Sequence, residues 1–219
     1  MNWFFQAFQA DAPLLPSLAW AQLWLPLGWS VVLAWLAANA VAFGSGGRSV
    51  QMGAALAAMV WTWIPGPNGP AFWLGLAFQA PSLMLVLLCA SALLLRWANP
   101  RAEPAQLPGW PLAWAGALLG WILLLDTFAL FPVSVYALGN GPGVPFLVLL
   151  LVGLPWLMRG QRSGLSGATW LTALVIGLFV VTRLPRGNVW DALLDPCLWI
   201  GLQVICLRHW VRSKRPKSA

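Results

Sequence analysis

The chain has 219 residues, of which 60% are hydrophobic and only 8% are charged, and its mean hydropathy is +0.77. Soluble domains carry about 25% charged residues. This composition therefore excludes an ordinary water-soluble protein and predicts an all-α integral membrane protein. The apolar runs are continuous instead of alternating with polar residues, which favours helices over a membrane barrel. The 18 prolines and 21 glycines indicate that some of these helices are short or broken.

The formal charge of +7 does not require a nucleic-acid partner. The basic residues collect in short loops and at the C-terminus, which is the distribution of the positive-inside rule. The three cysteines lie inside apolar runs without CxxC spacing, so we interpret them as small packing residues and expect no disulfide framework.

Three segments follow one another along the chain. Residues 1–17 predict an interfacial segment, because its aromatic side chains prefer the headgroup layer. Residues 18–211 predict a single transmembrane helical domain, and residues 212–219 a basic cytoplasmic tail. The start of the chain lacks the basic region and cleavage site of a signal peptide, so we expect it to be retained.

About seven spans are predicted, forming a compact bundle. In chain order they cover residues 18–43, 50–64, 81–96, 110–125, 145–158, 164–182 and 189–210. Two of them, 50–64 and 145–158, are short for a hydrocarbon core that needs ~20 residues. A half-helix over 72–79 is expected before the third span, and a short surface helix or re-entrant turn within 133–144.

The distribution of charge over seven spans predicts the orientation. Ten of the twelve basic residues then fall on one face, and only Arg183 and Arg186 fall on the other. We therefore expect the N-terminus outside and the C-terminus in the cytoplasm of a bacterial-type inner membrane. Of the five acids, only Glu103 falls on the inner face.

Polar residues of both charges gather on the outer face, and we call them the outer polar cluster. Its members are Asp126, Arg183, Arg186, Asn188, Asp191 and Asp195. Asn188 is expected to cap the last helix, Asp191 and Asp195 to share one face of it, and Pro196 to bend its second turn. A functional interpretation has the two arginines binding a phosphate or carboxylate while an aspartate acts as a base. The favoured interpretation is structural: arginine and aspartate neutralise one another and fix the loop.

Asp126 is a special case because apolar residues surround it in the sequence. Its carboxylate should be costly to ionise without a partner, and Arg183 or Arg186 is the partner we expect. A proton relay is the alternative role, but it needs a second buried titrating group, and the sequence offers no evident one.

The remaining features predict packing and lipid contact. Gly116 and Gly120 form a small-xxx-small face for close helix packing. Basic residues of the tail are expected to contact anionic lipid at ~1 kcal/mol each, and they are Arg212, Lys214, Arg215 and Lys217. His209 is the only histidine, which excludes bis-histidine haem. We expect no metal and no cofactor, and we assign no catalytic residue, because no hydrolase, metalloprotease or nucleotide-binding motif occurs.

These features favour a non-catalytic membrane subunit or scaffold of a cell-envelope complex, with membrane lipids and a larger membrane protein as partners. Two alternatives remain open. The first is a small transporter or channel that uses Asp126 and the arginines. The second is an integral enzyme for a lipid-linked envelope precursor, with Asp191 or Asp195 as the base.

Overall fold

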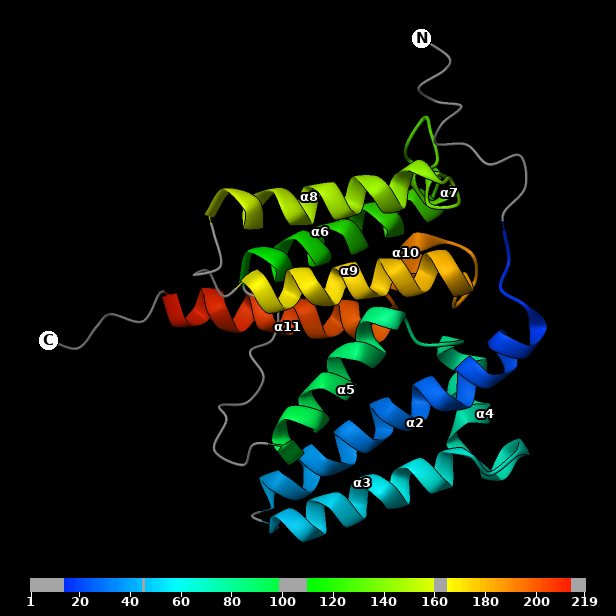
Figure 1. Cartoon of the computed structure of the whole chain (residues 1–219), viewed down its shortest axis with the longest axis vertical. Helices are drawn as coiled ribbons and strands as arrows, with labels where there is room; N and C mark the ends of the chain where they lie inside the picture. The colour runs from blue at the N-terminus through cyan, green and yellow to red at the C-terminus, as the bar shows by residue number, and fades with distance from the viewer. Residues whose placement is uncertain (1–13, 45, 99–109, 160–164, 214–219) are drawn as a thin grey trace, which may run out of the picture.

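The computed structural model describes residues 14–44, 46–98, 110–159 and 165–213, and these residues fold into helices without any strand (Figure 1). The first four helices are α2 (Leu18–Phe43), α3 (Arg48–Thr62), α4 (Pro70–Phe78) and α5 (Leu83–Ala98), with a 3-10 turn η1 (Gly66–Asn68) before α4. The remaining helices are α6 (Trp110–Thr127), α7 (Val135–Leu138), α8 (Gly143–Arg159), α9 (Leu165–Thr182), α10 (Val189–Leu193) and α11 (Pro196–Ser213). The all-α prediction is confirmed. The interfacial segment predicted for residues 1–17 lies mostly outside the described residues.

Helix α2 is the longest element, with 26 residues. The hydroxyl of Ser17 accepts a hydrogen bond from the backbone N–H of Trp20, which satisfies one of the free donors at a helix N-terminus. Helix α2 packs against α3 and α5 and has Pro26 in its interior. Its bounds agree with the first predicted span.

A break separates α4 from α5, as the sequence predicts. Gln79 ends α4 with a φ of 64°, in the left-handed region. Two indoles of α2 satisfy the carbonyls of the break: Trp29 Nε1 donates to Gln79 O at 2.8 Å, and Trp24 Nε1 donates to Pro81 O at 2.9 Å. These bonds satisfy two carbonyls that the interruption of the helix leaves without an intrahelical partner.

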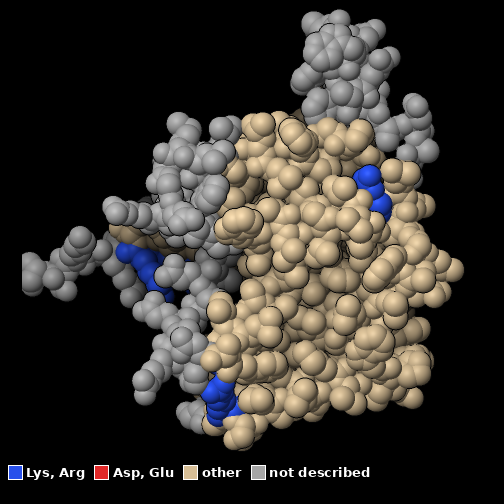
Figure 2. All heavy atoms as spheres, viewed as in Figure 1, with Lys and Arg blue, Asp and Glu red and all other residues tan. Residues whose placement is uncertain are grey.

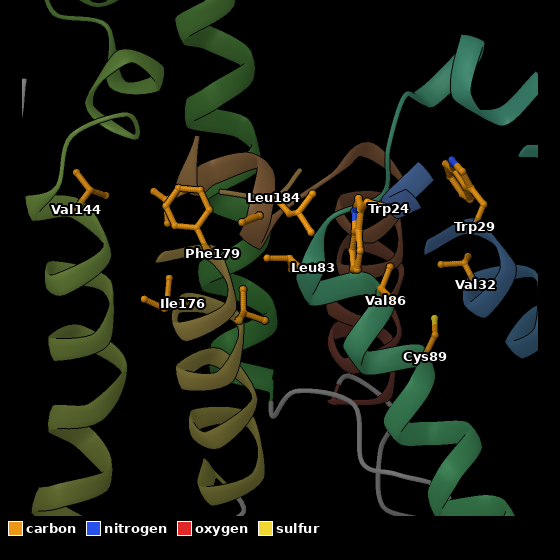
Figure 3. Close-up of a cluster of buried hydrophobic side chains, with 13 residues drawn as sticks. Trp24, Trp29, Val32, Leu83, Val86, Cys89, Val144, Ile176, Phe179 and Leu184 are labelled. Carbon is orange, nitrogen blue, oxygen red and sulfur yellow. The ribbon is translucent and has the colours of Figure 1, made fainter. Parts of the chain in front are cut away.

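Helix α5 joins the two halves of the molecule, because it packs against α2 on one side and against α9 on the other. Helices α8 and α9 pack together, as do α6 and α11. In the main core, Leu83 of α5 lies between Trp24 on one side and Phe179 and Leu184 on the other (Figure 3). Phe179 is 1% exposed.

The seventh predicted span requires a correction, because it is two helices. Helix α10 ends at Leu193, Leu194 is extended (φ −143°, ψ 133°), and α11 begins at Pro196. The reason is that Pro196 is the first residue of α11, where its fixed φ suits a helix start and its missing N–H is not needed. It does not bend the second turn of one continuous helix.

Charged residues lie at both ends of the bundle. One end of the bundle holds α7 and α10, and we call it the α10 end (Figure 1). The helices that begin there are α2, α5, α8 and α11, and those that end there are α3, α6 and α9. Arg183 and Arg186 lie there, whereas Arg48 begins α3 and Arg96 lies in the last turn of α5, at the opposite end. Figure 2 shows basic atoms only near helix ends on this face, with an uncharged surface between them.

The surface between the two ends is apolar. Near the middle of their helices, Leu56 of α3 is 55% exposed, Leu118 of α6 56% and Leu151 of α8 60%. Within the described residues, α2 is the one helix that is both long and apolar enough to cross a membrane. Shorter apolar helices span Leu83–Ala98, Leu112–Thr127, Gly143–Gly153 and Thr169–Thr182.

Candidate functional site

Tyr136, the only tyrosine of the chain, lies at the centre of the outer polar cluster. Its backbone N–H donates to Asp126 Oδ2 at 2.8 Å, and its hydroxyl donates to Asp191 Oδ2 at 2.8 Å. Its carbonyl accepts a bond from Asn188 Nδ2, also at 2.8 Å. The short helix α7 therefore joins three members of the cluster. Sequence reasoning did not assign Tyr136 to the site, although a single tyrosine inside a polar turn was a usable signal.

Asp126 does not pair with Arg183 or Arg186 as expected. Its carboxylate accepts hydrogen bonds from the Ser134 hydroxyl at 2.9 Å and from the N–H of Tyr136. The chain reverses directly after α6, so the start of α7 folds back onto the last turn of α6 and supplies these nearer donors. Asp126 thus closes the α6–α7 turn.

Asn188 caps α10, as predicted. Its side-chain oxygen accepts from the N–H of Trp190 at 2.9 Å, and the residue is only 2% exposed. The adjacent backbone fixes α7 against α10, because Val189 N–H donates to Gly139 O at 3.0 Å and Trp190 Nε1 donates to Val135 O at 2.9 Å. A Cβ at Gly139 would lie 2.2 Å from the Asn188 oxygen, so only glycine fits there.

Asp191 is half-buried beneath α7. Burial raises its pKa, while the Tyr136 hydroxyl and the positive charge of Arg186 act in the opposite direction. Burial also raises the pKa of Tyr136 to about 12, and the hydrogen bond to Asp191 adds to that rise. The tyrosine therefore keeps its proton and remains the donor of the pair near neutral pH.

Asp195 has a different role from Asp191, and the prediction that they share one helix face is wrong. Asp195 Oδ1 accepts from the N–H of Leu198 at 2.8 Å and caps α11. Its Oδ2 accepts from the N–H of Ser82 at 2.8 Å, at the start of α5. One carboxylate thus binds the N-terminal ends of two helices, where negative charge is stabilising.

The two arginines have different surroundings. Arg186 lies near Asp191 and Tyr136, and its positive charge favours the ionised form of both. The guanidinium of Arg183 lies over the ring of Phe179, 5.4 Å from its centroid. Arg186 therefore acts electrostatically on an aspartate, whereas the contact of the Arg183 guanidinium is an aromatic ring.

Two cavities open beside these helices, and both are lined mainly by apolar side chains. One, of about 280 Å³, lies among α2, α9 and the start of α5, and we call it the α2–α9 groove. The other, of about 220 Å³, lies between α8 and α9. Both are suited to apolar occupants.

The predicted packing glycines face α11 of the same chain. A Cβ at Gly116 would lie 2.6 Å from Leu202 Cδ1, and one at Gly120 would lie 2.2 Å from Trp199 Cδ1. This small-residue face therefore packs closely against α11 within the bundle, and α11 fills it. Of the basic tail, Arg212 is exposed near the end of α11, and Lys214, Arg215 and Lys217 lie outside the described residues.

Among the described residues, no group of three histidine, cysteine, aspartate or glutamate side chains is placed to hold a metal ion. Comparison of the chain with protein-family models, with curated proteins and with solved structures finds no match.

Proposed function

We propose that this chain is a multi-pass protein of a bacterial-type inner membrane, with seven spans formed by α2, α3, α5, α6, α8, α9 and α11. Large apolar side chains exposed along these helices support the proposal, because soluble monomers rarely expose extended apolar patches. Charged residues near the helix ends are consistent with it (Figure 2). In this arrangement α7 and α10 lie on the outer surface, and the C-terminus is cytoplasmic.

Within the membrane we propose a non-catalytic subunit or scaffold of a cell-envelope complex. The observation that carries this proposal is the use of the cluster's carboxylates. Asp126 closes a turn, Asp191 accepts from Tyr136, and Asp195 caps two helices. A general base or an ion site needs a carboxylate that is free to engage substrate, whereas these carboxylates hold the bundle together.

A partner would be expected to dock on the open helix faces. At Gly177 of α9 and Gly201 of α11, nothing apart from the adjacent residues and the neighbouring backbone of the same helix lies within 4 Å of the position that a Cβ would take. Small residues on exposed faces allow another helix to approach closely in a membrane. Because α11 fills the Gly116 and Gly120 face, these open faces are the surface that we assign to a partner.

Copurification tests the scaffold proposal. The tagged protein is extracted from its native membrane in mild detergent, and the assembly is sized and its components are identified by mass. We expect a larger membrane protein in fixed stoichiometry, reduced in amount by Gly177→Leu. A monomer or homodimer without a second component would contradict the scaffold proposal.

Reporter fusions test the topology independently of any partner. A fluorescent protein that matures only in the cytoplasm, fused after residue 219, should fluoresce, and one inserted between residues 139 and 140 should not. The reverse pattern would contradict the proposed orientation.

The transporter and enzyme alternatives have less support. A transporter would use a polar cavity that reaches the middle of the membrane, but the two cavities described above have mainly apolar linings. An enzyme of the kind predicted would use a groove that ends at Asp191 and Asp195, but these side chains are engaged in holding α7, α5 and α11.

A further inference from the structure

The backbone conformation of Arg183 is unusual. Its φ is 60°, in the left-handed region, and its N–H bonds Phe179 O at 2.7 Å to close the C-terminus of α9. Glycine or asparagine is the usual residue at this position of a helix end. A bulky side chain in this conformation is uncommon and costs free energy. We therefore expect the side chain of Arg183 to have a role that offsets this cost.

The carboxylates nearby do not supply that role. Asp191 bonds to Tyr136, and Asp195 bonds to the starts of α5 and α11. Arg186 contributes to the electrostatics of Asp191, whereas the contact of the Arg183 guanidinium is the Phe179 ring. Among the described residues, no carboxylate contacts this guanidinium, which brings a positive charge and five hydrogen-bond donors to the α10 end.

The α2–α9 groove extends to the turn that carries Arg183. Its lining includes Thr182 and Leu184, the residues on either side of Arg183. Helices α2 and α9 both pack against α5. Leu83 of α5 lies between Trp24 and Leu184 (Figure 3), and all three side chains line the groove. The lining residues come from the turns of α2, α5 and α9 nearest the α10 end, so the groove and the guanidinium share one level of the bundle.

We propose that the α2–α9 groove binds one anionic phospholipid, with an acyl chain along the groove and its phosphate on Arg183. The groove supplies an apolar surface of mainly leucine and tryptophan side chains. The guanidinium supplies a planar pair of donors that matches phosphate oxygens. Basic patches have the same electrostatic preference for anionic headgroups. This proposal rests on the membrane placement but not on the scaffold role.

Lipid retention measured by native mass spectrometry tests the proposal. The intact protein is reconstituted in phosphatidylcholine with an equal amount of phosphatidylglycerol, extracted in mild detergent, and the lipids that remain bound are identified. We expect one retained phosphatidylglycerol in wild type. Arg183→Asn should lower the ratio of retained phosphatidylglycerol to phosphatidylcholine about tenfold, the loss expected for a charged hydrogen bond.

Three further variants make the result specific. Arg208→Asn removes one exposed charge at the opposite end of the bundle and should leave the ratio near wild type. Leu178→Trp places bulk in the groove and should lower retention of both lipids. Arg183→Lys keeps the positive charge but loses the planar pair of donors, and should give an intermediate ratio. Asparagine adopts positive φ readily, so Arg183→Asn should unfold no more easily than wild type.

Equal ratios for Arg183→Asn and Arg208→Asn would overturn the proposal, as would unchanged retention in Leu178→Trp. Release of the lipid by soluble glycerol phosphate would also overturn it, because the site would then recognise phosphate alone. Absence of a protein partner in copurification leaves these outcomes unaffected, so failure of the scaffold proposal and failure of the lipid proposal are distinguishable.

Discussion

The hydroxyl of Tyr136 donates to Asp191 Oδ2 at 2.8 Å, across 55 residues of sequence. The bond joins α7, which follows α6, to α10, which follows α9. Helices α6 and α9 do not share a large interface within the described residues, so this small polar layer connects the two parts of the chain at the α10 end.

Tyr136→Phe should destabilise the bundle by about 1 to 3 kcal/mol, because it leaves a half-buried carboxylate without its donor. The measurement is the free energy of unfolding in mixed detergent micelles. Thr127→Val is the matched control, since the Thr127 hydroxyl bonds only a carbonyl of its own helix, Leu124 O. We expect the control to change stability by less than about 0.5 kcal/mol. Equal effects of the two variants on the free energy of unfolding would show that the Tyr136–Asp191 bond does not contribute more to stability than a hydroxyl bond within one helix.

Asp195→Ala should cost more, about 2 to 4 kcal/mol, because it removes a helix cap and a second acceptor together. Asp195→Asn keeps an acceptor oxygen and should retain much of that stability. Ser82→Ala is the control at the same place, since it removes only the hydroxyl that caps α5 through Leu85 N–H. If Asp195→Ala were no worse than Ser82→Ala, the double cap would not be a main source of stability.

Asp191 should give the bundle a characteristic pH dependence. Its pKa in the folded protein is raised, mainly by burial. The folded state therefore keeps this proton over a pH range in which the unfolded state has lost it. Stability should fall as pH rises from the unfolded-state value of 3.8 through the raised folded-state value. This part of the profile should be flat in Asp191→Asn.

The measurement is the unfolding midpoint of both proteins at a series of pH values. Parallel profiles for wild type and Asp191→Asn would contradict the prediction. Asp195→Asn serves as a reference for the loss of an acidic group from the same end of the bundle.

Gly120→Ala should destabilise the α6–α11 contact by about 1 to 3 kcal/mol, the usual cost of overpacking. The new methyl would lie against the Trp199 ring, which is itself held by a bond from its Nε1 to Ala117 O at 3.1 Å. Gly53→Ala is the control, because α3 has open space at that position, and alanine there should stabilise the helix by about 0.5 to 1 kcal/mol. A stabilising effect at both positions would mean that Trp199 can move aside.

The helices were predictable because continuous apolar runs end at turn residues. The break after Gln79 followed from the length of the apolar run and from Pro81, and α4 and α5 begin and end close to the predicted limits. The error came at Pro196, where the same residue type was read as a bend within one helix. A proline that follows an aspartate suits the start of a new helix equally well. The sequence pattern alone does not favour a helix start over a bend.

The outer polar cluster was predictable as a set of residues but not as a set of contacts. Opposite charges suggested ion pairs, yet Asp126 and Asp195 took backbone N–H groups as partners. Helix starts and tight turns present such donors at short range, and that geometry is fixed only once the chain has folded. The role of Tyr136 depends on the same geometry, since its contacts reach residues 10, 52 and 55 positions away.

The break between α4 and α5 has a consequence for the order of assembly. Its carbonyls are satisfied by Trp24 and Trp29, which are synthesised earlier, but its Ser82 N–H depends on Asp195, 113 residues later. During synthesis the start of α5 is therefore made with a donor whose partner, Asp195, comes only just before α11. The bundle is complete at this point only when Asp195 has been made, so a chain truncated before Asp195 should leave the Ser82 N–H without this partner and should fold less stably.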